Sequence, residues 1–95
     1  MDAYAILAVA CRMAGTDPDL IRLGAAIRAI RGRKQFTQER LALRSRLDRS
    51  FVGQVERGES NVSFLNVLRL LQGLDSSWSE LAVLLETPEI QSPRP

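Results

Sequence analysis

The sequence predicts a compact all-α fold of five or six helices. Apolar residues recur at helical spacing in several segments of the 95-residue chain, and a Ser, Thr or Asp stands before most of these segments, where it can cap a helix. Residues 36–58, FTQERLALRSRLDRSFVGQVERG, indicate two short helices joined by a tight polar turn. We therefore expect a helix-turn-helix unit with the remaining helices packed around it.

The composition is that of one small soluble domain. Hydrophobic residues make up 45% of the chain, and no apolar run is long enough to span a membrane. Residues 3–10 are apolar, but no basic residue precedes them, so we expect no signal peptide. The single cysteine, Cys11, cannot form an internal disulfide, which together with the missing export signal predicts a cytoplasmic location.

The residue types argue against catalysis. The chain has no His and only one Cys, so neither a conventional zinc site nor a nucleophile paired with His can be assembled. We expect a protein that is not an enzyme and that uses no metal, cofactor or small-molecule ligand.

Positive charge is concentrated in the middle of the chain. Residues 1–19 carry one basic and three acidic side chains (−2), residues 20–58 carry ten and three (+7), and residues 59–95 carry two and five (−3), which sum to +2. Local basicity of this kind is typical of a protein that binds the phosphate backbone of nucleic acid. A solvated basic face is the alternative that charge alone leaves open.

The chain divides into an extension (residues 1–16), a domain (residues 17–85) and a tail (residues 86–95). In the extension, residues 3–13 predict an apolar helix that needs a partner surface. Asp17 and Pro18 mark the start of the first domain helix, which we expect to end at Gly32. Its buried stripe would consist of Leu20, Leu23, Ile27 and Ile30. The tail is rich in Pro and polar residues and is expected to be disordered.

Capping residues and glycines delimit the later helices. Thr37 and Asp48 would cap the two helices of the central unit, residues 45–47 would form the turn between them, and Gly58 would end the second. The inward side chains of this unit would be Leu41, Ala42, Val52 and Val55, with Gly53 allowing close approach. Ser63 would cap the next helix, whose apolar face would consist of Phe64, Val67, Leu68, Leu71 and Leu74, and residues 78–85 predict a last short helix.

Residues 23–81 resemble the Cro/lambda-repressor type of helix-turn-helix (XRE-like) domain. The resemblance rests on LGAAIRAIR, TQERLA, LDRSFVGQVERGESN and SFLNVLRLLQGL, which follow one another at the spacing of that family. The block LDRSFVGQVERG is most similar to the controller proteins of restriction-modification operons. The resemblance implies a lambda-repressor-like fold and a DNA-binding regulator of transcription.

Base-reading side chains are expected at the start of the second helix of the unit, because a recognition helix places its first turn in the major groove. Arg49 and Ser50 occupy this turn, and Gln54 follows Ser50 by four residues on the same face. Arg49 suits guanine and Gln54 suits adenine. The family resemblance implies the same three positions, and a phosphate contact is the alternative for Arg49.

Phosphate contacts are expected around this helix. The resemblance implies one for Gln38, for which a plain solvent-facing role is the alternative. Residues beside the groove that can reach the backbone are Arg46, Arg57, Ser60 and Asn61. Glu56 is acidic within a basic unit, and we expect it to pair with Arg40 or Arg44.

A short apolar surface near the C-terminus predicts dimerisation. Single recognition helices make few base contacts, so such proteins usually bind inverted repeats as two-fold dimers. The candidate interface residues are Leu65, Trp78, Leu84 and Leu85, whose alternative role is to close the monomer core. For Leu81 the core is the better interpretation.

The predicted function is therefore a regulator that binds double-stranded DNA as a homodimer on an inverted-repeat operator. The resemblance to controller proteins implies that this operator belongs to a restriction-modification operon. The alternative is an antitoxin-like or adaptor protein whose apolar termini bind another protein. Its mark would be a stoichiometric partner protein on purification from the native host.

Overall fold

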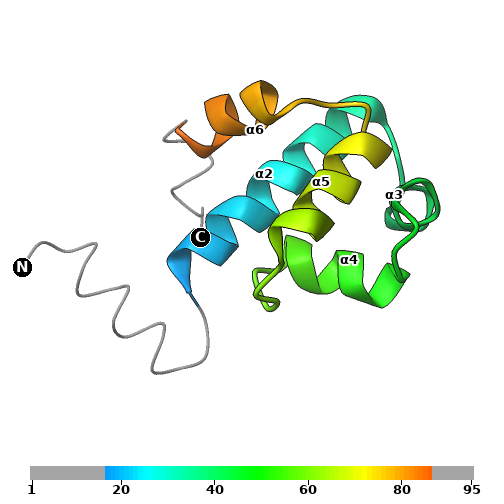
Figure 1. The fold of residues 1–95 in the computed structure, drawn as a ribbon, viewed down its shortest axis with the longest axis horizontal. Coiled ribbons are helices and arrows are strands. Elements are labelled where there is room, and N and C mark those ends of the chain that lie inside the picture. Colours follow the sequence, from blue (N-terminus) through cyan, green and yellow to red (C-terminus); the bar gives the residue numbers. More distant parts are fainter. Residues whose placement is uncertain (1–16, 87–95) are drawn as a thin grey trace, which may run out of the picture.

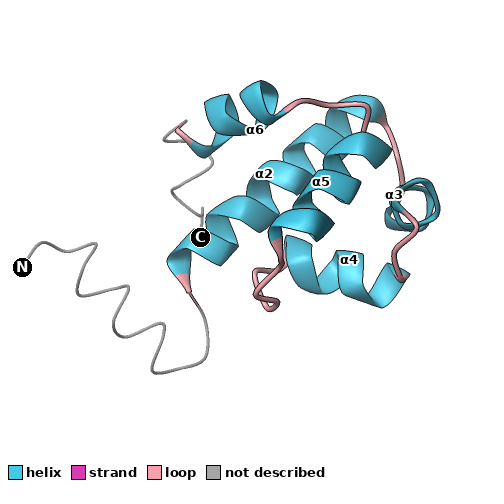
Figure 2. Ribbon diagram, viewed as in Figure 1, coloured by secondary structure: helices cyan, strands magenta, loops and turns pink. Residues whose placement is uncertain are grey.

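The computed structural model describes residues 17–86, which form five α-helices (Figure 1). In chain order these are α2 (Pro18–Lys34), α3 (Gln38–Ser45), α4 (Arg49–Glu56), α5 (Phe64–Gly73) and α6 (Trp78–Leu85). No strand occurs within residues 17–86 (Figure 2), so the predicted all-α fold is confirmed. The predicted helix of residues 3–13 and the tail beyond Glu86 lie outside the described residues.

Side-chain caps start the helices where the sequence predicts them. The side chains of Asp17, Thr37, Asp48 and Ser63 each accept a hydrogen bond from a backbone N–H two or three residues ahead, at 2.8 to 3.2 Å. Each bond satisfies an N–H group that has no partner within the helix. The starts of four helices are thus encoded locally.

The end of α2 differs from the prediction. The helix does not stop at Gly32 but continues to Lys34, and Gln35 then takes the left-handed conformation with φ of 60°. The N–H of Gln35 and the N–H of Phe36 donate to the carbonyls of Gly32 and Arg31 at 3.1 and 3.2 Å. These two bonds close the helix end without a glycine at the left-handed position.

The close crossings of the fold occur at glycines other than the predicted Gly53. A methyl group added at Gly53 would meet only the side chain of Arg57, so this glycine does not allow a neighbouring helix to approach. At Gly24, by contrast, a methyl group would lie within 3.0 Å of the carbonyl oxygens of Val55 and Glu56. Gly24 therefore sets the distance at which α2 crosses the end of α4.

The core is built from buried side chains of all five helices. Helix α3 packs against α4 and α5, and α2 packs against α4 and α6. The predicted inward residues Leu41, Ala42, Val52 and Val55 are buried, as are Ile27 and Ile30 of α2. Leu20 and Leu23 are only half-buried. The core holds the helix-turn-helix unit from behind and leaves the outer face of α4 in solvent.

The apolar face of α5 is partly different from the predicted one. Val67, Leu71 and Leu74 are buried as expected, and Leu70, which the sequence pattern did not single out, is fully buried. Phe64 is 71% exposed, and its ring stacks on that of Trp78. As the first residue of α5, Phe64 lies at the edge of the domain.

Candidate nucleic-acid interface

Helices α3 and α4 form the predicted helix-turn-helix unit. The turn between them contains Arg46 in the left-handed conformation, with φ of 58°. The N–H of Leu47 donates to the carbonyl of Ala42 at 3.0 Å, which fixes the direction in which the chain enters α4. Because Val52 and Val55 are buried, the opposite face of α4 points outward.

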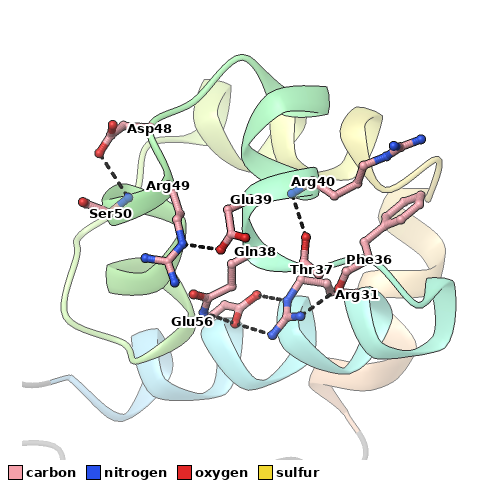
Figure 3. Close-up of polar contacts among 10 residues, drawn as sticks. All are labelled: Arg31, Phe36, Thr37, Gln38, Glu39, Arg40, Asp48, Arg49, Ser50 and Glu56. Atoms are coloured by element: carbon pink, nitrogen blue, oxygen red, sulfur yellow. Dashed lines mark hydrogen bonds and ion pairs between the residues drawn. The ribbon is translucent and has the colours of Figure 1, made fainter.

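The three predicted base-reading residues are exposed on α4. Arg49 and Ser50 form its first turn (Figure 3), and Gln54 is exposed one turn further along. The backbone N–H of Ser50 is capped by Asp48, which leaves the Ser50 hydroxyl outside the cap. This is the arrangement that a recognition helix needs, and the base-reading role stays a prediction.

Arg49 is tied to the neighbouring helix by an ion pair. Its Nε donates to Oε1 of Glu39, in the first turn of α3, at 2.6 Å (Figure 3). The side chains of Arg49 and Glu39 are 59% and 66% exposed, so the pair lies on the surface. The sequence pattern did not identify this contact, because both residues are surface charges with several possible partners.

Glu56 pairs with Arg31, and not with Arg40 or Arg44 as predicted. Arg31 donates from Nε to Oε2 of Glu56 at 2.6 Å and from Nη2 to Oε1 at 3.0 Å. The prediction was wrong because Glu56 lies against α2, where the crossing at Gly24 brings the two helices together. Arg44 donates instead to the carbonyl of Gly73.

The same carboxylate orients Gln38. The Nε2 of Gln38 donates to Oε1 of Glu56 at 2.9 Å, and Nη1 of Arg31 donates to the carbonyl of Phe36 at 2.9 Å (Figure 3). Since the Gln38 amide nitrogen carries two hydrogens, one remains for an outside acceptor. Gln38 is therefore oriented by Glu56 and has a second amide hydrogen available, while its contact with a phosphate stays a prediction.

The other predicted phosphate contacts lie at the rim of α4 and in the loops around it. Arg46, Arg57 and Asn61 are exposed, and Ser60 is half-buried. The Nε of Arg57 donates to Oε2 of Glu59 at 3.0 Å, and this bond raises the pKa of the Arg57 guanidinium above its ordinary value. The phosphate contacts of these four residues remain predictions.

An apolar groove opens on the side of the domain formed by α2, α5 and α6. Its volume is about 270 Å³, and it is lined by Leu23, Val62, Phe64, Val67, Trp78, Leu81, Ala82 and Leu85. The rings of Phe64 and Trp78 stack with centroids 5.0 Å apart and planes 8° from parallel.

Three of the four predicted interface residues have exposed surface. Leu65 and Trp78 are exposed, and Leu85 is half-buried at the groove. Leu84 is 4% exposed and belongs to the monomer core, so it has little surface to offer a second subunit. Phe64 and Val83 are exposed apolar residues that the sequence interpretation did not include.

Residues 17–86 contain no candidate metal cluster and no candidate membrane span. No three His, Cys, Asp or Glu side chains of this part of the chain come together as possible metal ligands. None of its helices is long and apolar enough to cross a membrane.

The fold and the exposed face of α4 define a DNA-binding regulator of the helix-turn-helix class. The model of the helix-turn-helix family matches residues 27–81, and the chain belongs to this family. Among characterised relatives, the control protein C.MunI of Mycoplasma sp. is 36% identical over 62 residues, which cover 64% of this chain and 84% of that protein.

Two solved structures similar to this chain are restriction-modification controller proteins. The restriction-modification controller protein C.AhdI of Aeromonas hydrophila matches with a TM-score of 0.64 and 49% identity, over 66% of this chain and 96% of that one. The wild-type restriction-modification controller protein C.Esp1396I matches with a TM-score of 0.68 and 31% identity, over 70% of this chain and 88% of that one. The predicted similarity to controller proteins is confirmed.

Proposed function

We propose that residues 17–85 form the DNA-binding domain of a controller of a restriction-modification operon, which binds an inverted-repeat operator as a homodimer. The observation that carries this proposal is the first turn of α4, where Arg49 and Ser50 are exposed on a helix whose opposite face is buried. The similarity to two restriction-modification controller proteins favours this function over that of an antitoxin-like or adaptor protein.

Recognition of bases would occur through three side chains of α4. Arg49 can donate two hydrogen bonds to O6 and N7 of guanine, and Gln54 can pair with the N6 and N7 edge of adenine. Ser50 has a hydroxyl that donates or accepts, which suits either kind of base. The buried valines of α4 hold these side chains on one rigid helix.

Contacts with phosphates would fix the position of α4 in the major groove of the DNA. Gln38 lies at the N-terminus of α3, next to backbone N–H groups that favour anions. Arg46, Arg57, Ser60 and Asn61 would contact the backbone on either side of the groove. Such contacts contribute affinity for any sequence and weaken as the salt concentration rises.

A second copy of the chain would cover the apolar groove formed by α2, α5 and α6. Two recognition helices of a dimer must reach half-sites about 34 Å apart, which requires a fixed interface. Exposed apolar side chains gather at the start of α5 and α6 as Phe64, Leu65 and Trp78, and a patch of this kind commonly marks a protein interface.

Binding selection from a random duplex library tests the roles of Arg49 and Arg57. We expect Arg49→Ala to remove the preference at one base pair of each half-site and Arg57→Ala to weaken binding to all sequences. The Arg57→Ala variant should also reduce the salt dependence of binding by about one counterion, while Arg49→Ala leaves that dependence closer to wild type. Equal losses of specific and random binding in both variants would contradict the assignment.

Sedimentation of charged variants tests the dimer. Phe64→Asp and Leu65→Asp place a carboxylate in the first turn of α5, where the helix dipole favours it, so folding should be retained. We expect either variant to shift the protein to monomers and to weaken operator binding. Leu43→Asp is the matched control, because Leu43 is 77% exposed on α3, a helix that contributes no residue to the groove. If the variant that combines Phe64→Asp with Leu65→Asp remained dimeric, this interface would be ruled out.

A further inference from the structure

The exposed pair of Arg49 and Glu39 is not explained by stability. Its 2.6 Å contact joins α3 to α4 on the outer face of the helix-turn-helix unit (Figure 3). With side chains 59% and 66% exposed, such a pair contributes about 0 to 1 kcal/mol to folding. The backbone hydrogen bonds of the turn and the buried side chains already fix the two helices relative to each other.

The carboxylate also opposes DNA binding. Glu39 lies in the first turn of α3, within the segment of residues 20–58 that carries a net charge of +7. A negative charge beside a base-reading residue repels phosphates and lowers the affinity for any duplex. An acidic residue in the first turn also stabilises a helix by about 0.3 to 1 kcal/mol, and this contribution does not require the contact with Arg49.

The contact leaves the base-reading edge of Arg49 free. Glu39 accepts from Nε, and a guanidinium has four further N–H donors on Nη1 and Nη2. The edge formed by these two nitrogens can donate two parallel hydrogen bonds to O6 and N7 of guanine. An unrestrained Arg side chain loses much rotamer freedom when it binds, whereas one held at Nε has already lost part of it.

We propose that Glu39 is a positioning residue that sets the preference of Arg49 for guanine by holding the guanidinium at Nε. The proposal rests on the base-reading role of Arg49 proposed above. It requires Glu39 to act in two opposite directions, because the same side chain weakens binding to random DNA and strengthens discrimination at one base pair.

Two substitutions separate the effect of Glu39 on binding to random DNA from its effect on base preference. Glu39→Gln removes the charge and weakens the contact, so binding to random duplex should become about twofold to fivefold tighter. In the same variant the preference for guanine should fall by about twofold to fivefold, which is the most that an exposed contact of this kind can contribute. Glu39→Asp keeps the charge but is one methylene shorter, so the preference should fall while random binding stays at the wild-type level.

The measurements use the full chain and duplexes obtained by selection from a random library. For each protein, binding is compared on the selected duplex, on duplexes with the guanine pair replaced, and on random duplex at one salt concentration. As a control, Glu39→Gln in the Arg49→Ala background should tighten random binding without changing any base preference. Urea unfolding of Glu39→Gln should give a midpoint close to wild type.

The outcomes distinguish this proposal from the function on which it rests. If Glu39→Gln tightens binding to all duplexes by the same factor while Arg49→Ala removes the guanine preference, Glu39 is only a repulsive charge and the proposal is overturned. If Arg49→Ala leaves every base preference intact, the base-reading assignment itself fails, and the role of Glu39 fails with it.

Discussion

Two arginine–glutamate pairs in this domain have the same shortest distance and different surroundings. Arg31 and Glu56 approach to 2.6 Å with side chains 17% and 3% exposed. Arg49 and Glu39 also approach to 2.6 Å, but their side chains are 59% and 66% exposed. The distance alone therefore says little about what either pair does.

Burial and the number of partners decide the difference. Glu56 accepts two hydrogen bonds from Arg31 and one from Gln38, so one carboxylate links α2, α3 and α4 (Figure 3). Because a charge left unpaired in this place would be expensive, the buried pair constrains the fold. The exposed pair makes one contact that water can replace, so its effect should appear in DNA recognition and not in folding.

Breaking the buried pair should have the largest effect. We expect Arg31→Met to lower the free energy of unfolding by about 3 to 5 kcal/mol, because it leaves the Glu56 carboxylate buried with only Gln38 as a partner. Urea unfolding followed by circular dichroism measures this change. The variant should bind DNA only to the extent that it is folded.

The double variant Arg31→Met with Glu56→Leu is the control for this prediction. Replacing both charges by apolar side chains removes the unpaired carboxylate, so the double variant should be more stable than Arg31→Met alone. A single variant within 1 kcal/mol of wild type would mean that water reaches Glu56 and that the pair behaves like the exposed one.

The helix crossing next to the buried pair should tolerate change almost as poorly. A methyl group at Gly24 would lie within 3.0 Å of backbone carbonyl oxygens of α4, so Gly24→Ala should destabilise the domain by about 1 to 3 kcal/mol. Gly32→Ala, in the same helix, is the matched control, since nothing lies within 4 Å of its added methyl group. That variant should gain about 0.5 to 1 kcal/mol. Thermal unfolding of both variants shows whether their signs differ.

Local signals made most of the fold predictable from the sequence. The caps Asp17, Thr37, Asp48 and Ser63 bond to backbone N–H groups two or three residues away, so their effect depends on neighbours in the chain. The helix-turn-helix unit followed from these caps together with the apolar spacing between them.

The missed features depend on residues far apart in the sequence. The bond between Arg31 and Glu56 spans 25 residues, and the crossing at Gly24 depends on the position of α4. The sequence allows several arginines as partners for Glu56, and only the packing of α2 against α4 selects one of them. For the site, the exposure of Arg49 was predictable from its place after a cap. Its contact with Glu39 was not, because that contact depends on the angle between α3 and α4.

The exposed pair should give the smallest effect on stability. A double-mutant cycle of Glu39→Gln and Arg49→Gln should yield a coupling energy of about 0.2 to 1 kcal/mol, because water competes for both partners. In 1 M salt this coupling should shrink, since screening acts strongly on exposed charges, while the coupling of Arg31 and Glu56 should change less. Urea unfolding of the four proteins of this cycle, and of the four proteins of an Arg31→Met and Glu56→Leu cycle, at two salt concentrations measures both coupling energies. A coupling above 2 kcal/mol that persists at high salt would show that the Arg49 and Glu39 pair stabilises the fold, and the contrast between the two pairs would then be lost.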